Sequence, residues 1–283
     1  MLGLMVLPLI TCLILIAILV YLGIHIVERE VIFVDLALAQ IAALGTLIAF
    51  IFGLEMHGTS AFLTSLAFTI AGAAIFTLTR AREKSISQEA IIGVVYAFSA
   101  AGAILVLNWA PAEAEHIKHM LVGNILFVKV PEVILVGVIA GVIGLFHYIY
   151  RNKFLLISTN AAEAERKGIS LRWWDFLFYV TFGLVITSSV AIAGVLLVFS
   201  YLIAPAVCAM LVSSNIKVRL VLGWSVGLLA SLIGLYLSAS FDFPTGAAIV
   251  CTLSLFVPLA ALLIRLMRSR NVVVSSPVRG GEK

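Results

Sequence analysis

Few side chains in this sequence could bind a charged group inside an apolar segment, and Asp35 is the clearest of them. It lies in REVIFVDLALAQIAALG, residues 29–45, where aliphatic residues surround its carboxylate. Ionisable residues at membrane depth are costly, so they usually line a pathway or meet a partner charge. Asp35 could therefore belong to a cation pathway, or it could pair with Arg29 near the membrane surface. Gln40 follows five residues later, about 140° further around a helix, so the two share no narrow face.

A second set of candidate ligands lies between two apolar segments and consists of Glu113, Glu115, His116 and His119. His116 and His119 are three residues apart, a spacing that can present two imidazoles to a metal ion from one helical face. The alternative is that both are solvated loop side chains. In either case an acidic surface that contains histidines would concentrate cations. The sequence thus allows an external metal-binding vestibule.

The polar stretch Arg151–Asp175 interrupts the apolar chain and carries the signals of one short helix. Asn160 is a good N-cap, and Glu163 completes a capping-box pattern. Glu163 and Lys167 can pair at i,i+4, and Gly168 is a natural stop. A helix of about two turns is marginal alone. The pattern therefore predicts either a solvated connector or an element that docks on a cytoplasmic partner protein.

The elements that must position these residues are membrane spans. Hydrophobic residues make up 63% of the 283 residues and charged residues only 11%, against about 25% charged in soluble domains. Segments of about 20 apolar residues predict an all-α polytopic membrane protein with nine transmembrane helices, eight being possible. The predicted spans are 2–26, 31–54, 61–79, 90–107, 133–150, 176–189, 191–212, 218–238 and 243–267. The count depends on dividing the apolar run 173–212 near Thr187–Ser189, since it is too long for one span.

The basic residues give this arrangement a direction, because cytoplasmic loops carry an excess of Lys and Arg. With nine spans, sixteen of the 18 basic residues fall on one side, which places the N-terminus outside and the C-terminus in the cytoplasm. The only exceptions are Lys118 and Lys129. This reading gives one transmembrane domain over 1–267, with a cytoplasmic loop at 151–172, and a polar basic tail over 268–283.

Other features narrow the class of protein. Pro205 interrupts FSYLIAPAVCAM, where it removes a backbone donor and indicates either a helix that lines a cavity or a packed kink. Small residues at Ala42 and Gly45 predict close packing of the second span on a neighbour. The sequence contains no phosphate-binding G-x-x-x-x-G-K-[ST] motif and no cluster of nucleophile and base within the spans. The missing motifs argue against an enzyme. The basic balance of 18 Lys and Arg against 14 Asp and Glu does not indicate nucleic-acid binding, because these charges belong to loops.

The sequence resembles the membrane permeases of binding-protein-dependent ABC transporters for zinc, manganese and iron. The resemblance is carried by EVIFVDLALAQIAALG, KFLLISTNAAEAERKGI, VITSSVAIAGVLLVFSYLIAPAVCAML and DFPTGAAIV. It implies a multi-pass protein of the bacterial plasma membrane that works as a homodimer or paired permease. It also implies two cytoplasmic ATPase subunits, an extracytoplasmic metal-binding protein and a transported divalent metal, with no cofactor bound by this chain. Residues 160–168 would then be the coupling helix.

One segment departs from the family pattern. Members carry an aspartate and a histidine four residues apart in the second span, as ligands of the metal path. Alignment on AQIAALG puts Leu36 at the aspartate position and Gln40 at the histidine position, with Asp35 one residue early. Glutamine is a poor ligand for zinc beside His or Cys. The sequence therefore leaves two candidate substrates open, a bare divalent metal ion and a chelated metal of the siderophore or cobalamin type. An ion-coupled secondary transporter is the least favoured class of protein.

Overall fold

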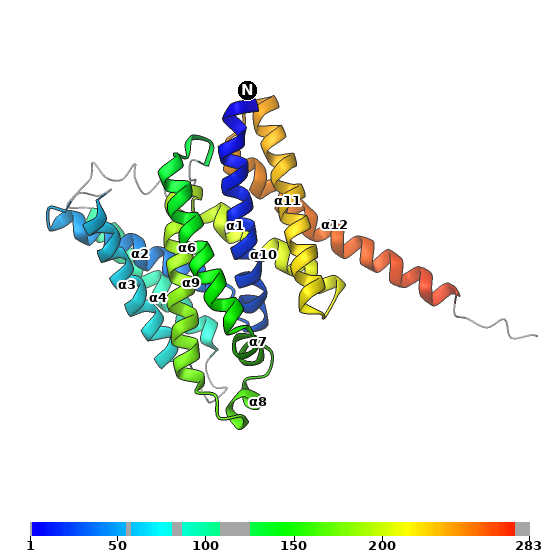
Figure 1. Ribbon diagram of the computed structural model, residues 1–283, viewed down its shortest axis with the longest axis horizontal. Coiled ribbons are helices and arrows are strands. Elements are labelled where there is room, and N and C mark those ends of the chain that lie inside the picture. The colour runs from blue at the N-terminus through cyan, green and yellow to red at the C-terminus, as the bar shows by residue number, and fades with distance from the viewer. Residues whose placement is uncertain (1, 55–57, 81–86, 108–124, 275–283) are drawn as a thin grey trace, which may run out of the picture.

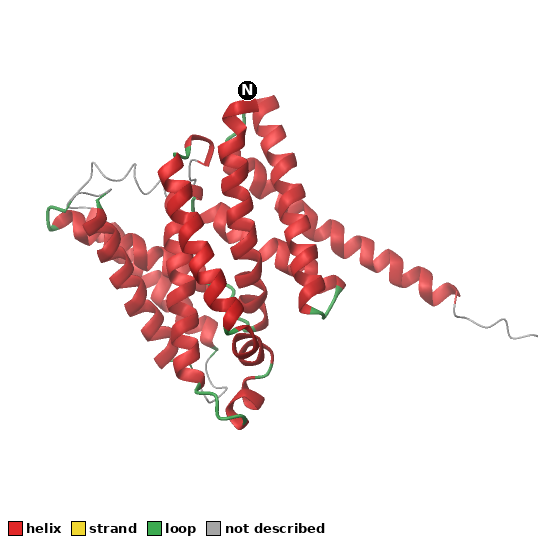
Figure 2. Cartoon of the chain, in the orientation of Figure 1, coloured by secondary structure: helices red, strands yellow, loops and turns green. Residues whose placement is uncertain are grey.

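The computed structural model describes residues 2–54, 58–80, 87–107 and 125–274, and these residues form a bundle of helices (Figure 1). Figure 2 shows helices and loops but no strand within this described part of the chain. The helices are α1 (Leu2–Glu28), α2 (Val34–Ile51), α3 (Thr59–Leu78), α4 (Gln88–Leu107), η2 (Ile125–Phe127), α6 (Val130–Ile149), α7 (Arg151–Thr159), α8 (Ala161–Arg166), α9 (Leu171–Ala193), α10 (Val195–Val212), α11 (Ile216–Phe241) and α12 (Thr245–Val274). Nine helices in the described residues are long and apolar enough to cross a membrane, which confirms the all-α, nine-span prediction.

The boundary between the sixth and seventh spans lies at Gly194, so the predicted break near Thr187–Ser189 is wrong. Ser188 and Ser189 are buried inside α9, and the Ser188 hydroxyl donates to the carbonyl oxygen of Leu184 at 2.9 Å within the same helix. Small polar residues can thus continue a helix by bonding to its own backbone. Gly194 has φ +78°, a conformation that only glycine adopts readily, and it separates α9 from α10 without a loop.

Helix α1 is the central element of the bundle. It contacts α6, α7, α10 and α11, and in Figure 1 it lies between α6 on one side and α11 on the other. Its residues Leu15, Leu19 and Leu22 have no exposed surface. A helix that is apolar all round can pack against neighbours on several sides, as α1 does, while its remaining face, which includes Ile10 and Leu13, is exposed to the membrane.

Helices α2 and α3 approach closely through small residues, as the sequence predicts. A Cβ added at Gly45 would lie 2.9 Å from Cβ of Phe68 on α3. Beside it, the Ser65 hydroxyl donates to the carbonyl oxygen of Ala42 at 3.0 Å. Small side chains and interhelical hydrogen bonds are the usual means by which membrane helices associate.

The charged ends of several helices meet at one end of the bundle. Arg219 at the start of α11 pairs with Glu28 at the end of α1, and both Arg29 and Arg80 pair with Asp175 at the start of α9. The first residues of α1 and helix α8 lie at opposite ends of the molecule (Figure 1). Three of the basic residues that the sequence grouped on one side, Arg29, Arg80 and Arg219, therefore lie at the same end of the bundle.

The last helix is longer than the predicted span. Helix α12 continues to Val274, so the first residues of the predicted tail 268–283 extend this helix. Residues 275–283 lie outside the described part of the chain. The division into a domain over 1–267 and a tail over 268–283 stays a prediction.

Candidate functional site

The connector between the fifth and sixth spans contains two helices, α7 and α8, where the sequence predicts one. Helix α7 is not a solvated segment, because Phe154 and Ile157 are buried against the bundle. The Phe154 ring stacks on the imidazole of His147 with 4.2 Å between ring centroids, and it lies edge-on to Trp174 of α9. The predicted cytoplasmic loop 151–172 is thus anchored on the spans that precede and follow it.

Helix α8 has the start that the sequence predicts. The Asn160 side chain accepts a hydrogen bond from the backbone N–H of Glu163 at 3.0 Å. Lys167 and Glu163 form an ion pair with 2.7 Å between Nζ and Oε1. This contact lowers the pKa of the exposed Glu163 carboxyl, chiefly through the hydrogen bond from Lys167. Its small contribution to helix stability is present above the ordinary pKa of glutamate and is lost as the pH falls.

The end of α8 is a Schellman motif centred on Gly168, whose φ is +73°. The N–H of Gly168 donates to the carbonyl of Glu165 at 2.9 Å, and the N–H of Ile169 donates to that of Ala164 at 3.0 Å. Ala164 is completely buried and α8 contacts α7 and α9, so the chain itself supports one side of this helix. The capped helix at 161–167 is confirmed to within one residue, and its docking role stays a proposal.

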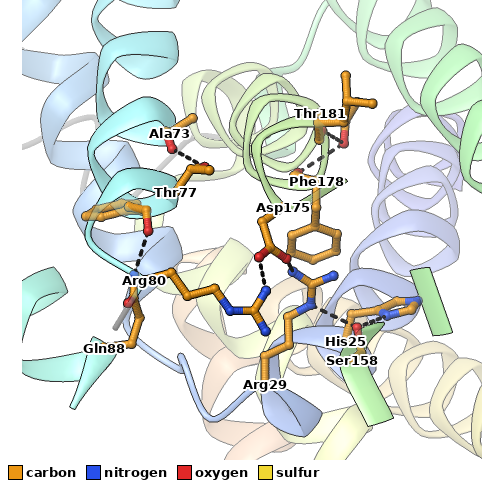
Figure 3. Close-up of polar contacts among 12 residues, drawn as sticks. His25, Arg29, Ala73, Thr77, Arg80, Gln88, Ser158, Asp175, Phe178 and Thr181 are labelled. Atoms are coloured by element: carbon orange, nitrogen blue, oxygen red, sulfur yellow. Dashed lines mark hydrogen bonds and ion pairs between the residues drawn. The ribbon is translucent and has the colours of Figure 1, made fainter. Parts of the chain in front are cut away.

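Next to this connector lies a buried ionic network that we call the Arg29–Asp175–Arg80 network. The Asp175 carboxylate on α9 has no exposed surface, and Arg29 Nη1 donates to its Oδ1 at 2.9 Å. Arg80, which follows α3, pairs with its other oxygen from the opposite side (Figure 3). The Arg29 guanidinium also lies 3.9 Å from the ring centroid of Phe178, a cation–π contact.

Helix α7 joins the network through Ser158. The Ser158 hydroxyl lies 2.8 Å from Nε of Arg29 and 2.8 Å from Nδ1 of His25, both on the α1 side (Figure 3). A second buried histidine, His147 on α6, lies 2.9 Å from the hydroxyl of Thr181 on α9. Both histidines are therefore buried hydrogen-bonding groups.

Burial lowers the pKa of the Arg29 guanidinium to about 10, and it also lowers the pKa of Arg80. Arginine stays protonated in proteins, so Arg29 and Arg80 together carry one more positive charge than Asp175 neutralises. Breaking a buried ion pair by removing one partner is strongly destabilising, because the other charge stays desolvated. The network thus favours one arrangement of α1, α3, α7 and α9.

Sequence reasoning missed Asp175 because it was counted as the last residue of a polar loop. Helix α9 begins at Leu171, so Asp175 occupies its second turn and faces the bundle. One signal could have identified it: an acidic residue at the start of an apolar run, on the side that collects the basic residues. Arg29 and Arg80 flank other spans on that same side.

The structure places the predicted pathway residues separately. Asp35 lies in the first turn of α2, is buried, and its Oδ1 has no hydrogen-bond partner among the described residues. Arg29 pairs with Asp175 instead of Asp35, so the structural pair considered from the sequence is not formed. Gln40 is partly buried further along α2. Pro205 is buried within the continuous helix α10, and its carbonyl oxygen would lie 3.5 Å from a Cβ at Gly223 of α11.

The possible external ligands Glu113, Glu115, His116 and His119 lie outside the described residues. Within the described residues, no three His, Cys, Asp or Glu side chains are grouped so that they could hold a metal ion. The metal path through Asp35, Gln40 and Pro205 stays a prediction.

Comparison with known proteins places this architecture in a family. The sequence model of the ABC 3 transport family matches residues 1–264. The chain is 27% identical over 195 residues to the manganese transport system membrane protein MntC of Listeria monocytogenes, covering 69% of each chain. It is 24% identical over 255 residues to the manganese import system permease protein ScaB of Streptococcus parasanguinis, covering 90% of this chain and 88% of that one.

A solved structure shares the fold. A chain of PsaBC from Streptococcus pneumoniae in complex with Fab superimposes with a TM-score of 0.75 and 24% sequence identity, covering 90% of this chain and 89% of that chain. The family match runs from the first residue through most of α12, and it includes all nine spans, the connector and the Arg29–Asp175–Arg80 network. On this evidence the chain belongs to the ABC 3 transport family and is a multi-pass membrane permease.

Proposed function

We propose that this chain is the membrane-spanning subunit of an ABC importer for divalent metal ions, driven by ATP hydrolysis on a separate subunit. The family match and the manganese transport named for its relatives support this substrate class. The observation that carries the proposal is the capped helix α8, which lies at the end of the bundle and packs on α7, the helix whose Ser158 joins the buried ionic network. Movement of a partner protein bound to such an element could displace it and, through its contacts, displace the spans.

The proposed assembly has two copies of this chain, two cytoplasmic ATP-binding-cassette subunits and an extracytoplasmic metal-binding protein. The basic residues at the α8 end favour a cytoplasmic location for α8 and the C-terminus, and an external N-terminus. The chain would lie in the bacterial plasma membrane. The metal is its substrate, and no cofactor is assigned to this chain.

Coupling would run from α8 through α7 to the network. A hollow of about 580 Å³ beside α8 is lined by Arg80, Glu165 and Arg172, among other residues. It offers a concave cytoplasmic surface next to one member of the network. A shift of α8 and α7 would move Ser158, which contacts both Arg29 and His25. Because Arg29 and Arg80 share Asp175, such a shift would reach α1, α3 and α9 together.

Gly168→Val is expected to reduce metal uptake about tenfold with the protein still inserted. A β-branched residue at φ +73° costs on the order of 1–2 kcal/mol, and 1.4 kcal/mol corresponds to tenfold in an equilibrium constant. A Cβ at Gly168 meets no atom within 4 Å, so the effect comes from the backbone of the α8 end and not from a clash. Uptake and ATPase activity stimulated by the loaded binding protein would be measured in proteoliposomes.

Gly168→Asn is the matched control, because asparagine tolerates the left-handed conformation, and it should behave like the wild type. Unchanged subunit association, stimulated hydrolysis and uptake in Gly168→Val would remove α8 from the coupling route.

Asp35→Asn is expected to lower the rate of metal uptake about tenfold or more. A tenfold loss corresponds to the free energy of about one favourable charge interaction. The substitution keeps the size of the side chain but removes its charge, and Asp35 is the buried acid in α2 whose Oδ1 has no partner among the described residues. Initial rates of manganese uptake would be compared with those of Asp242→Asn. Asp242 is an exposed acid with φ +56° at the other end of the bundle, where asparagine is readily accommodated. Wild-type uptake by a normally expressed Asp35→Asn protein would assign Asp35 a structural role.

The function itself is tested by reconstituting the chain with its ATPase in vesicles that contain ATP. We expect accumulation of manganese or a similar free divalent metal that depends on ATP and persists when ionophores collapse the ion gradients. Accumulation of a chelated metal but not of the free ion would support the siderophore or cobalamin type of permease. Uptake that needs an ion gradient and no ATP would instead identify a secondary transporter.

A further inference from the structure

A groove on the outside of the bundle shares α7 with the proposed coupling route but contains no residue of the Arg29–Asp175–Arg80 network. Its volume is about 730 Å³, and it is bounded by α1, α6, α7 and α11. Figure 1 shows α6 and α11 on either side of α1, with α7 at the lower end near α8. The groove therefore runs along the membrane-facing side of three spans and ends where the basic residues gather.

The upper part of the groove has an apolar wall of small and aliphatic residues. Gly144 of α6 contributes no side chain, and a Cβ there would still be 3.9 Å from Cδ1 of Ile18. Trp224 of α11 forms the opposite wall. Its indole N–H donates to the carbonyl oxygen of Ala17 at 3.3 Å, and 41% of its side chain remains exposed. This part has the shape and polarity to hold a hydrocarbon chain.

The lower end of the groove is basic. Arg151 and Asn152 from the start of α7 face Lys217 from the start of α11 across it. The Arg151 guanidinium lies 4.5 Å from the ring centroid of Tyr148, which fixes its position near the rim. Over the described part of the chain, no carboxylate is within ion-pair distance of Arg151 or Lys217, whereas Lys167 and Arg219 at the same end each have one. Two cations at one rim thus have no counter-ion among the residues that the structure describes.

We propose that this groove binds one anionic phospholipid from the cytoplasmic leaflet. Its phosphate would lie between Arg151 and Lys217, and one acyl chain would run along the wall formed by α1, α6 and Trp224. Basic pockets between spans on the cytoplasmic side suit anionic headgroups, and the bilayer supplies this ligand. A second copy of the chain is a poorer occupant, because a symmetric contact here would set the two basic rims against each other.

The test is native mass spectrometry of the purified wild-type protein, titrated with phosphatidylglycerol and with phosphatidylcholine. We expect one phosphatidylglycerol to bind tightly and phosphatidylcholine to bind weakly. Arg151→Gln/Lys217→Gln should bind phosphatidylglycerol roughly 30-fold more weakly, the factor for about 1 kcal/mol from each of two basic residues near the anionic headgroup. The control Lys153→Gln/Arg265→Gln removes two exposed cations of the same end that do not line the groove, and should bind like the wild type.

Gly144→Leu tests the acyl-chain part, because its side chain would fill the wall and should weaken binding without altering the rim. Size-exclusion profiles and melting temperatures would establish that each variant is folded. Equal phosphatidylglycerol binding by wild type and Arg151→Gln/Lys217→Gln would overturn the proposal. Displacement of the lipid by millimolar inorganic phosphate would show a free-anion site instead, and cross-linking across Trp224 in a dimer would show that a second copy fills the groove.

Discussion

Gly23→Ala is expected to abolish correct folding, leaving less than about a tenth of the wild-type yield of folded protein. A Cβ at Gly23 of α1 would lie 1.9 Å from the carbonyl oxygen of Leu202 on α10, and 2.8 Å from its carbonyl carbon. The obstacle is backbone, so no side-chain rotation can relieve it. Overpacking a core typically costs about 1–3 kcal/mol and occasionally more, out of about 5–15 kcal/mol of total stability.

The yield would be measured by fluorescence-detected size exclusion, with a thermal melt of whatever protein is recovered. Gly141→Ala on α6 is the matched control, because a Cβ there meets no atom within 4 Å. Helix propensity favours alanine over glycine by about 1 kcal/mol in both helices. A Gly23→Ala protein as abundant and stable as Gly141→Ala would show that α1 and α10 are less closely packed than this structure has them.

The features that the sequence predicts well depend on neighbouring residues or on composition. The cap at Asn160 and the stop at Gly168 are confirmed because their signals lie within one short segment. The nine spans are confirmed because a bilayer requires about 20 apolar residues in each. Charge counting also grouped Arg29 and Arg80 correctly, since both lie at the end of the bundle that carries α8.

The features that the sequence did not predict depend on which spans are neighbours. That Asp175 joins Arg29 and Arg80 follows from the packing of α1, α3 and α9, and no local pattern encodes it. The break at Gly194 was missed because a positive φ at one glycine leaves little trace in hydropathy. Asp35 attracted attention through its type alone, and only the three-dimensional structure shows that its Oδ1 has no hydrogen-bond partner among the described residues.

Asp175→Ala is the second change with a large expected effect, because it leaves two arginines without their shared counter-ion. The Arg29 side chain is only 5% exposed, so it cannot reach water without rearrangement, whereas Arg80 is 29% exposed. Removing one partner of a buried ion pair typically costs about 3–5 kcal/mol. We expect a lower melting temperature, a reduced yield, and loss of uptake in the protein that does insert. Asp242→Asn, which removes the charge of an exposed acid at φ +56° where asparagine is readily accommodated, should change none of these.

A double variant separates the stability of the network from its role in coupling. Arg29→Met/Asp175→Leu replaces the buried pair with apolar side chains of similar size, an exchange that is often neutral or stabilising. We therefore expect this variant to melt well above Asp175→Ala, with Arg80 free to turn toward solvent. The metal uptake of this variant should stay low, because neither new side chain can form a hydrogen bond with Ser158 of α7. In the wild-type protein the Ser158 hydroxyl accepts a hydrogen bond from Nε of Arg29. Stimulated ATPase activity and manganese uptake would be measured on protein normalised for folded amount. Recovery of uptake together with stability would mean that the Arg29–Asp175–Arg80 network only holds the helices together, and that the motion of α8 reaches the spans by another route.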